Sequence, residues 1–245
     1  MIVSFLWYFA GLLILVGVLC VVKPIGWLRL RTRRRAAMAA VAGVLLAAAT
    51  LFVGTGTSRV STPLSQLDAV FPVFQFREAH VLDIDAPADR VYKALFEVTP
   101  EEITGYRTLT WIRCLGRCGG DNIMNPTSRT PILESALKSF RRLAERPNEE
   151  LVFGGFVAAP AGTARRTWTT ETFVGLTEPG FAKVAMNFRL APLGDRRTRL
   201  DTETRVQVTD AWTLRVFAAY WRTIYPGSAI IRRSWLRAIK ARAEG

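Results

Sequence analysis

Few residues in this chain of 245 residues could perform chemistry. A single histidine, His80, argues against a histidine-based metal site and against a Ser-His-Asp triad. No partner for His80 is evident along the sequence, so a structural or surface role is favoured over catalysis. We therefore name no catalytic residue, no metal ligand and no cofactor. A protein without enzymatic activity is favoured, although the sequence leaves this undecided.

The cysteines define a second candidate feature. Cys114 and Cys118 are spaced C-x3-C, which supplies half a zinc site at best because the chain contains no second pair. Two alternatives stay open: a disulfide that closes a glycine-rich loop, or two free thiols. Residues 119–122, GGDN, indicate a turn, because no strand–loop–helix context for a phosphate-binding loop surrounds them.

Charge gives only weak information about a partner. The formal net charge of +13 suggests nucleic acid, anionic lipid or the cytoplasmic face of a membrane. Residues 1–78 hold eight basic and two acidic residues, which leaves 25 basic and 18 acidic residues and a net charge of +7 for the remainder. We therefore expect no nucleic-acid partner.

Two uncharged segments at the N-terminus predict a transmembrane helical hairpin over residues 1–54. Its helices are residues 2–22 and 36–54, and the loop 23–35 contains six basic residues and no acid. The positive-inside rule places this loop in the cytoplasm and both termini outside, in a two-pass topology of the inner (plasma) membrane. Alternatively, the sequence from Met38 resembles a signal peptide. Both interpretations place residues 55–245 on the extracytoplasmic side.

Beyond the hairpin, residues 55–78 are predicted to form a stalk or linker. The next segments predict a strand over 79–86, amphipathic helices over 87–98 and 132–146, and strands over 150–158, 166–176, 181–190 and 198–209. A long helical region, 211–243, is expected to break at Pro226-Gly227, with Ser228 capping its second half. Alternation in the last two strands predicts one buried face and one solvated face, with the charged residues from Arg199 to Arg205 on the solvated side. This order of elements is α+β.

The two ends of the large domain resemble a known superfamily. VLDIDAPADRVYKAL near its start and LDTETRVQVTDAWTLRVFAAYWRTIYPGSAIIRRSWLRAIKARAE at its end are similar to bacterial proteins of the START-like, or SRPBCC, superfamily, which includes polyketide cyclases and plant pollen allergens. The resemblance covers residues 79–245 and implies a helix-grip fold, a curved antiparallel sheet around a long C-terminal helix. It also implies a cavity between sheet and helix that holds an apolar ligand.

The candidate binding residues are those that this fold would direct into the cavity. The sheet would contribute Val184, Met186, Phe188, Leu200, Thr202, Thr204 and Val206, and the helix would contribute Phe217, Tyr220, Trp221 and Ile224. The threonines indicate open space that a ligand or water oxygen would satisfy, because a buried hydroxyl without a partner costs about 1–3 kcal/mol. The opposing interpretation is that each hydroxyl bonds a neighbouring backbone group and the cavity is filled.

The sequence thus favours a membrane-anchored extracytoplasmic SRPBCC-like domain that binds a hydrophobic small molecule or lipid. Its expected partners are the lipid bilayer and that molecule. A structural or accessory subunit of a larger integral membrane complex, in contact with other membrane-protein subunits, is the first alternative. A cyclase- or hydrolase-type enzyme that uses the same cavity is the second.

Overall fold

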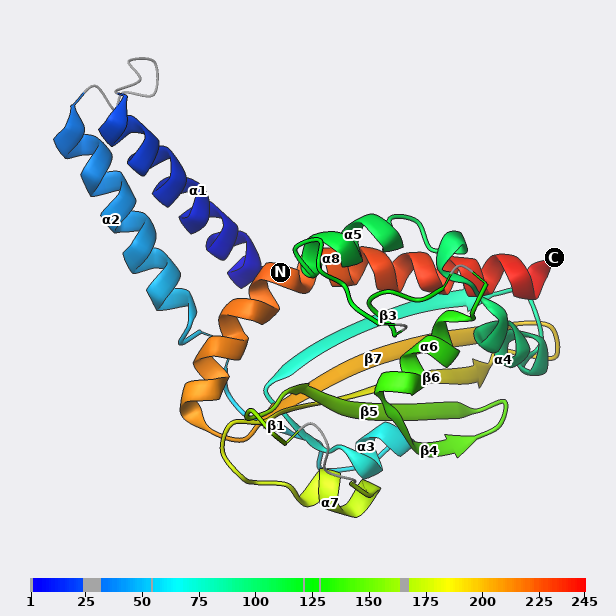
Figure 1. The fold of residues 1–245 in the computed structure, drawn as a ribbon. Helices are drawn as coiled ribbons and strands as arrows, with labels where there is room; N and C mark the ends of the chain where they lie inside the picture. The colour runs from blue at the N-terminus through cyan, green and yellow to red at the C-terminus, as the bar shows by residue number, and fades with distance from the viewer. Residues whose placement is uncertain (1, 24–31, 54, 121, 128, 164–167) are drawn as a thin grey trace. The chain divides into compact units, whose positions relative to one another are not determined.

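The computed structural model describes residues 2–23, 32–53, 55–120, 122–127, 129–163 and 168–245 (Figure 1). The chain forms two compact units. The first comprises Met1–Gly56 together with Leu214–Pro226, and the second comprises Thr57–Thr213 together with Gly227–Gly245. Most of the basic connector 23–35 lies outside the described residues.

The first unit is built on two antiparallel helices, α1 (Ile2–Val22) and α2 (Arg33–Thr50). Glycines allow their backbones to approach closely: a Cβ added at Gly17 would lie 2.6 Å from the backbone nitrogen of Ala40. At Gly43 an added Cβ would lie 2.8 Å from the carbonyl oxygen of Ala10. Small residues at such crossings are typical of helices that pack in a membrane. The rest of this unit is Leu214–Pro226, within which Thr223 Oγ1 accepts a hydrogen bond from Trp7 Nε1 at 3.1 Å.

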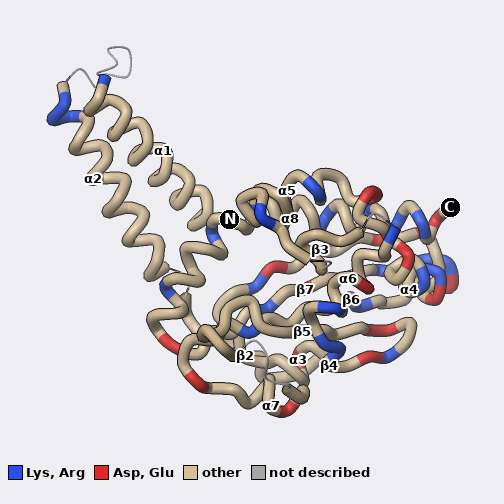
Figure 2. The backbone as a smooth tube through the Cα atoms, viewed as in Figure 1, with Lys and Arg blue, Asp and Glu red and all other residues tan. Residues whose placement is uncertain are grey.

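Among the described helices, only α1 is long and apolar enough to cross a membrane, and a signal sequence would have the same properties. The prediction of two transmembrane helices is therefore wrong. α2 begins at Arg33 and ends at Thr50, so residues 36–50 supply only about 22 Å of uncharged helix. That length is less than the roughly 30 Å of a bilayer's hydrocarbon core. Figure 2 shows that α1 contains no charged residue, whereas basic residues occur at the start of α2.

The second unit contains a curved, antiparallel, five-stranded sheet (Figure 1). Its strand order is β3 (Phe76–Ile84), β7 (Thr198–Val208), β6 (Ala182–Pro192), β5 (Glu150–Ala158) and β4 (Arg141–Arg146). A two-stranded sheet pairs β1 (Ser58–Arg59) with β2 (Val73–Phe74). The α+β order predicted from the sequence is confirmed.

Helices of this unit connect the strands and cover the sheet. They are α3 (Gln66–Val70), α4 (Ala88–Glu97), the 3-10 helix η2 (Pro100–Glu102), α5 (Tyr106–Arg113), α6 (Ile132–Ser139), α7 (Thr170–Gly175) and the C-terminal part of α8 (Ala211–Glu244). α8 continues through Pro226 instead of breaking there, and the Ser228 hydroxyl donates to Glu78 Oε2 at 2.8 Å instead of capping a new helix.

The two faces of the sheet are both covered. The C-terminal part of α8 packs on one face, which we call the inner face, through ring contacts such as Trp235 with Phe188 (centroids 5.0 Å apart). On the opposite, outer face, α3 and α7 bury a second apolar cluster that includes Leu67, Phe173 and Ala185. The outer face is therefore not simply solvated as expected, because residues 57–76 fold onto it instead of forming a free stalk.

Candidate functional site

The register of the sheet aligns polar and apolar side chains across the centre of the inner face. Two rows cross strands β3, β7 and β6: Glu78, Thr204 and Met186 in one, and His80, Thr202 and Phe188 in the next. Strand residues two apart point to the same face, so these side chains all project toward α8. Polar groups thus lie in the middle of a face whose neighbouring positions are apolar.

Arg232 of α8 reaches down onto these rows. Its side chain is buried, and its guanidinium donates to Thr204 Oγ1 at 2.7 Å and to Thr202 Oγ1 at 3.1 Å, while also lying against Met186 Sδ. Thr202 Oγ1 in turn donates to the carbonyl oxygen of Asn187 at 2.8 Å. The threonine hydroxyls therefore have partners, and the space above them contains an arginine.

A carboxylate–imidazole pair lies beside this arginine on β3. Glu78 Oε1 is 2.9 Å from His80 Nε2, and the Glu78 side chain is almost fully buried. The other oxygen of Glu78 accepts the Ser228 hydrogen bond from α8. A carboxylate that orients an imidazole is an arrangement suited to proton transfer. Groups of three or more metal-ligating side chains that could hold an ion are not found within the described part of the chain.

Burial sets the electrostatics of the site. Desolvation lowers the pKa of Arg232, and the charges of Glu78 and Tyr106 act in the opposite direction. Arginine nevertheless stays protonated in proteins, so a full positive charge lies between sheet and helix. Burial raises the pKa of Tyr106, whose hydroxyl donates to the Ile123 carbonyl.

Trp235 and Phe188 form an aromatic wall next to the polar rows. The two rings meet edge to face, and the Arg232 guanidinium lies 5.9 Å from the Trp235 ring centroid. Trp235 is 2% exposed, and its Nε1–H is buried without a hydrogen-bond partner among the described residues. Buried indole N–H groups usually have a partner. The wall therefore offers an unused hydrogen-bond donor.

The structure divides the predicted binding residues between the two units. The seven sheet residues are all buried and occupy the inner face of β6 and β7. The four helix residues, Phe217, Tyr220, Trp221 and Ile224, instead belong to the first unit, where Phe217 contacts the rings of Tyr220 and Trp221. Within the second unit, the residues of α8 that contact the sheet include Ser228, Arg232 and Trp235.

The sequence analysis did not identify Glu78 or Arg232 as site residues, although each interrupts a series of apolar residues. Phe76, Glu78, His80, Leu82 and Ile84 alternate along β3, so Glu78 stands in a series that is otherwise mostly apolar. Arg232 lies at helical spacing between Ser228 and Trp235, in the stripe that faces the sheet. A charged residue at a position that periodicity predicts to be buried could therefore have identified both.

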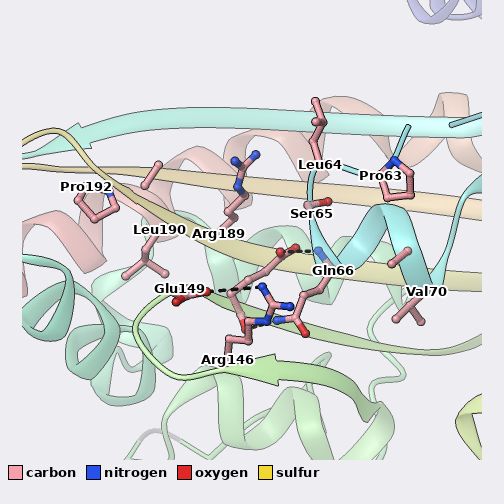
Figure 3. Close-up of a pocket in the computed structure, with 13 residues that line it drawn as sticks. Pro63, Leu64, Ser65, Gln66, Val70, Arg146, Glu149, Arg189, Leu190 and Pro192 are labelled. Atoms are coloured by element: carbon pink, nitrogen blue, oxygen red, sulfur yellow. Dashed lines mark hydrogen bonds and ion pairs between the residues drawn. The ribbon is translucent and has the colours of Figure 1, made fainter. Parts of the chain in front are cut away.

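An open groove lies elsewhere on the second unit, between α3, the β4–β5 turn and the end of β6 (Figure 3). Its volume is about 860 Å³, and its lining includes Gln66, Arg146, Glu149, Glu150 and Arg189. The Glu150 carboxylate is already engaged by the backbone N–H of Gln66 at 2.7 Å and by Asn187 Nδ2 at 2.7 Å. Its role is to hold α3 on the sheet, so this groove is the weaker candidate.

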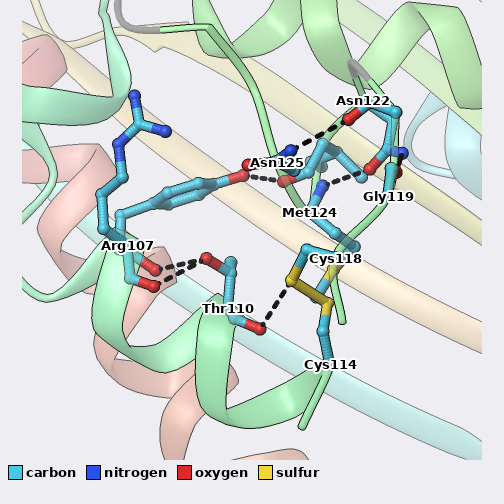
Figure 4. Close-up of a disulfide and its surroundings, with 11 residues drawn as sticks. Arg107, Thr110, Cys114, Cys118, Gly119, Asn122, Met124 and Asn125 are labelled. Carbon is cyan, nitrogen blue, oxygen red and sulfur yellow. Dashed lines mark hydrogen bonds between the residues drawn. A yellow bond between two sulfur atoms is a disulfide. The ribbon is translucent and has the colours of Figure 1, made fainter. Parts of the chain in front are cut away.

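The structure joins Cys114 and Cys118 in a disulfide at the end of α5, with their Cα atoms 5.2 Å apart (Figure 4). Cys118 Sγ also lies 3.4 Å from the carbonyl oxygen of Thr110. In the following segment the Asn122 side chain bonds the Gly119 carbonyl and the Met124 backbone N–H, which is a turn. Asp121 of the GGDN segment lies outside the described residues.

Comparison with known proteins yields only distant similarity. No family model and no curated protein matches the sequence. Similar solved structures include a conserved protein from Geobacillus kaustophilus (14% identity, TM-score 0.35), which is matched over 69% of this chain and 95% of the other. They also include the Zhui aromatase/cyclase from Streptomyces sp. R1128 (16% identity, TM-score 0.27), with coverages of 69% and 93%. At these identities and TM-scores, neither a ligand nor a reaction of these proteins can be assigned to this chain.

Proposed function

We propose that this protein is a membrane-attached domain of the helix-grip type that binds an apolar small molecule between the inner face of its sheet and α8. The observation that carries the proposal is the group formed by Glu78, Thr204 and Arg232 in the centre of a largely apolar face. A core that served stability alone would use aliphatic side chains there, because buried polar groups are costly to desolvate. Ligand sites characteristically combine apolar walls with a few convergent polar groups.

Membrane attachment is supported by the surface of the N-terminal hairpin. Large apolar side chains of α1 are exposed along its whole length, from Ile2 at 79% to Val22 at 76%. Exposed apolar residues also occur on α2, including Met38 and Leu45. A contiguous apolar surface of this kind is stable in lipid and costly in water. We propose that α1 attaches the protein to the membrane, where apolar molecules concentrate.

The proposed location of the second unit is the extracytoplasmic side. Disulfides persist in oxidising compartments and are rare in the cytoplasm, and the second unit contains the Cys114–Cys118 disulfide. This assignment rests on the disulfide alone, because a cytoplasmic connector 23–35 that follows a single spanning helix would place the second unit in the cytoplasm.

The Glu78–His80 pair supports a second candidate, acid–base chemistry on the bound molecule. In this case His80 would move a proton and Arg232 would hold a developing negative charge. A change in the mass of the extracted molecule during incubation with the native protein, but not with a His80→Gln variant, would favour this candidate. An unchanged mass in both incubations would favour binding alone.

Native mass spectrometry of the full-length protein, released from mild detergent, tests the binding function. We expect one small-molecule adduct per chain. Met186→Trp, which places a bulky ring against the Arg232 guanidinium, should abolish the adduct. Val81→Trp should retain it, because Val81 is 58% exposed. An adduct that survives Met186→Trp, or none in the wild type, would contradict the proposal, and a stoichiometric protein partner would favour the accessory-subunit alternative.

A further inference from the structure

The charge state of Arg232 distinguishes the inner face from the rest of the second unit. The acceptors that its guanidinium contacts are two threonine hydroxyls and a thioether, all neutral. Among the described residues, no carboxylate lies within 4.0 Å of its nitrogens. Glu78 is the acidic residue whose charge acts on Arg232, and its two carboxylate oxygens lie within hydrogen-bond distance of His80 and Ser228. The hydrogen-bond partners of the buried positive charge are therefore neutral, and Glu78 acts on it only from beyond ion-pair distance.

Arg205 on the outer face shows how the same protein treats a comparable arginine. Arg205 is 4% exposed, and its guanidinium is 2.5 Å from Asp68 Oδ1 and 2.6 Å from Glu203 Oε1. It also donates to the Phe71 carbonyl at 3.1 Å. Two carboxylates thus neutralise the buried arginine on the outer face, which is the usual requirement for a buried charge. On the inner face, none of the described carboxylates contacts the buried arginine in this way.

A second unused donor lies next to Arg232. Trp235, one turn further along α8, is 2% exposed and its Nε1–H has no partner among the described residues. Arg232 and Trp235 contact each other and share the Phe188 ring as a neighbour. A buried cation and a buried N–H donor in contact require acceptor oxygens, and an anionic acceptor satisfies both needs.

We infer that the molecule bound at the inner face is an apolar carboxylic acid whose carboxylate pairs with the Arg232 guanidinium and accepts from Trp235 Nε1. Arginine binds carboxylates in a bidentate geometry, and such charge-assisted bonds are the strong ones. Phe188 and the aliphatic residues of β6 and β7 would contact the apolar body of the acid. This inference rests on the proposed function and specifies its substrate class.

Matched acids and alcohols test the inference on the full-length protein in nanodiscs. Decanoate is compared with decanol, and 2-naphthoate with 2-naphthalenemethanol, so that an acyl chain and an aromatic ring are distinguished. Affinities are measured by tryptophan fluorescence, with empty nanodiscs as the blank. In at least one pair, we expect the acid to bind the wild type about tenfold or more tightly than the alcohol.

Three variants assign this preference to Arg232. Arg232→Met should bind acid and alcohol alike, Arg232→Lys should retain part of the preference, and Arg233→Met, at an exposed position, should retain all of it. Equal affinities for acid and alcohol in both pairs of the wild type would overturn this inference and leave the apolar site intact. Failure of every probe to bind would overturn the proposed function as well. A preference that persists in a folded Arg232→Met or Arg232→Lys protein at wild-type strength would place the anion elsewhere.

Discussion

Arg232 Nη2 and Thr204 Oγ1 lie 2.7 Å apart and join α8 to β7 across the inner face of the sheet. From the sequence, Thr204 indicated open space. In the structure, its hydroxyl instead accepts from a buried guanidinium. The threonines of β7 therefore position a charge, and this relationship links the stability of the fold to the proposed binding site.

Replacing Thr204 by Val tests this hydrogen bond. The change keeps the shape of the side chain but removes an acceptor from a buried charge, so we expect unfolding to become easier by about 1–2 kcal/mol. Thr108→Val, at an exposed position of α5, is the control and should change stability by less than about 0.5 kcal/mol. Equal effects in urea titrations of the two proteins would show that the bond contributes nothing.

Lys183 on the outer face should make stability depend on pH. It is fully buried, it donates to the carbonyls of Val174 and Leu176, and desolvation lowers its pKa to about 8. Between about pH 8 and 10.5 the unfolded chain therefore binds more protons at this residue than the folded protein. The penalty for burying the charged amine is complete below this window and disappears as pH rises through it, so stability should increase with pH.

The comparison with Lys183→Met isolates this effect. Across the same pH window, the difference in unfolding free energy between wild type and variant should shift in favour of the wild type as pH rises. Other titrating groups are common to both proteins and cancel. A difference that stays constant from neutral to alkaline pH would mean that Lys183 has an ordinary pKa in the folded protein.

The strands of the large sheet show what could be predicted from sequence. Alternation of apolar and polar residues located β6 and β7 closely, because one face of each strand packs against α8. Residues 141–146 were assigned to a helix but form β4, since pairing with β5 overrides the helix propensity of Leu, Ala, Glu and Arg. A predicted strand over 166–176 contains the helix α7 at its described end.

The binding site was less accessible to prediction. The periodicity of β6 and β7 was enough to place the seven sheet residues on the buried face. Predicting which residues of α8 lie opposite them also requires knowing which part of this 34-residue helix covers the sheet. A sheet of 11-residue strands spans about 36 Å, whereas α8 is about 51 Å long. The helical spacing of aromatic residues favoured the first half of α8 as the part that covers the sheet. The second half, which contains Arg232 and Trp235, packs there instead.

Asp68 tests the corrected view of residues 55–78. Because Asp68 pairs with the buried Arg205, Asp68→Asn should lower the free energy of unfolding by about 2 kcal/mol, with Glu203 limiting the loss. Asp85→Asn is the matched control, since the Asp85 side chain is 73% exposed and lies 3.5 Å from Arg197. If residues 55–78 were a free stalk, the two substitutions would have equally small effects in urea unfolding.

Counting thiols tests the disulfide. The chain contains three cysteines, and Cys20 is the free one. Protein that is denatured without reductant should therefore bind one equivalent of an alkylating reagent, and three after reduction. A Cys20→Ser variant should bind none before reduction. Three equivalents before reduction would show that Cys114 and Cys118 are thiols, and would remove the support for an extracytoplasmic location.

The side-chain resonance of Arg232 reports the central claim most directly. In protein prepared with isotope-labelled arginine, the Nε–H signal of Arg232 is the one lost in the Arg232→Lys variant. Titration with decanoate or 2-naphthoate should shift this signal, because a carboxylate replaces or joins neutral acceptors around the guanidinium, whereas the corresponding alcohols should leave it nearly unchanged. An Arg232 signal that stays in place at saturating acid would contradict the account.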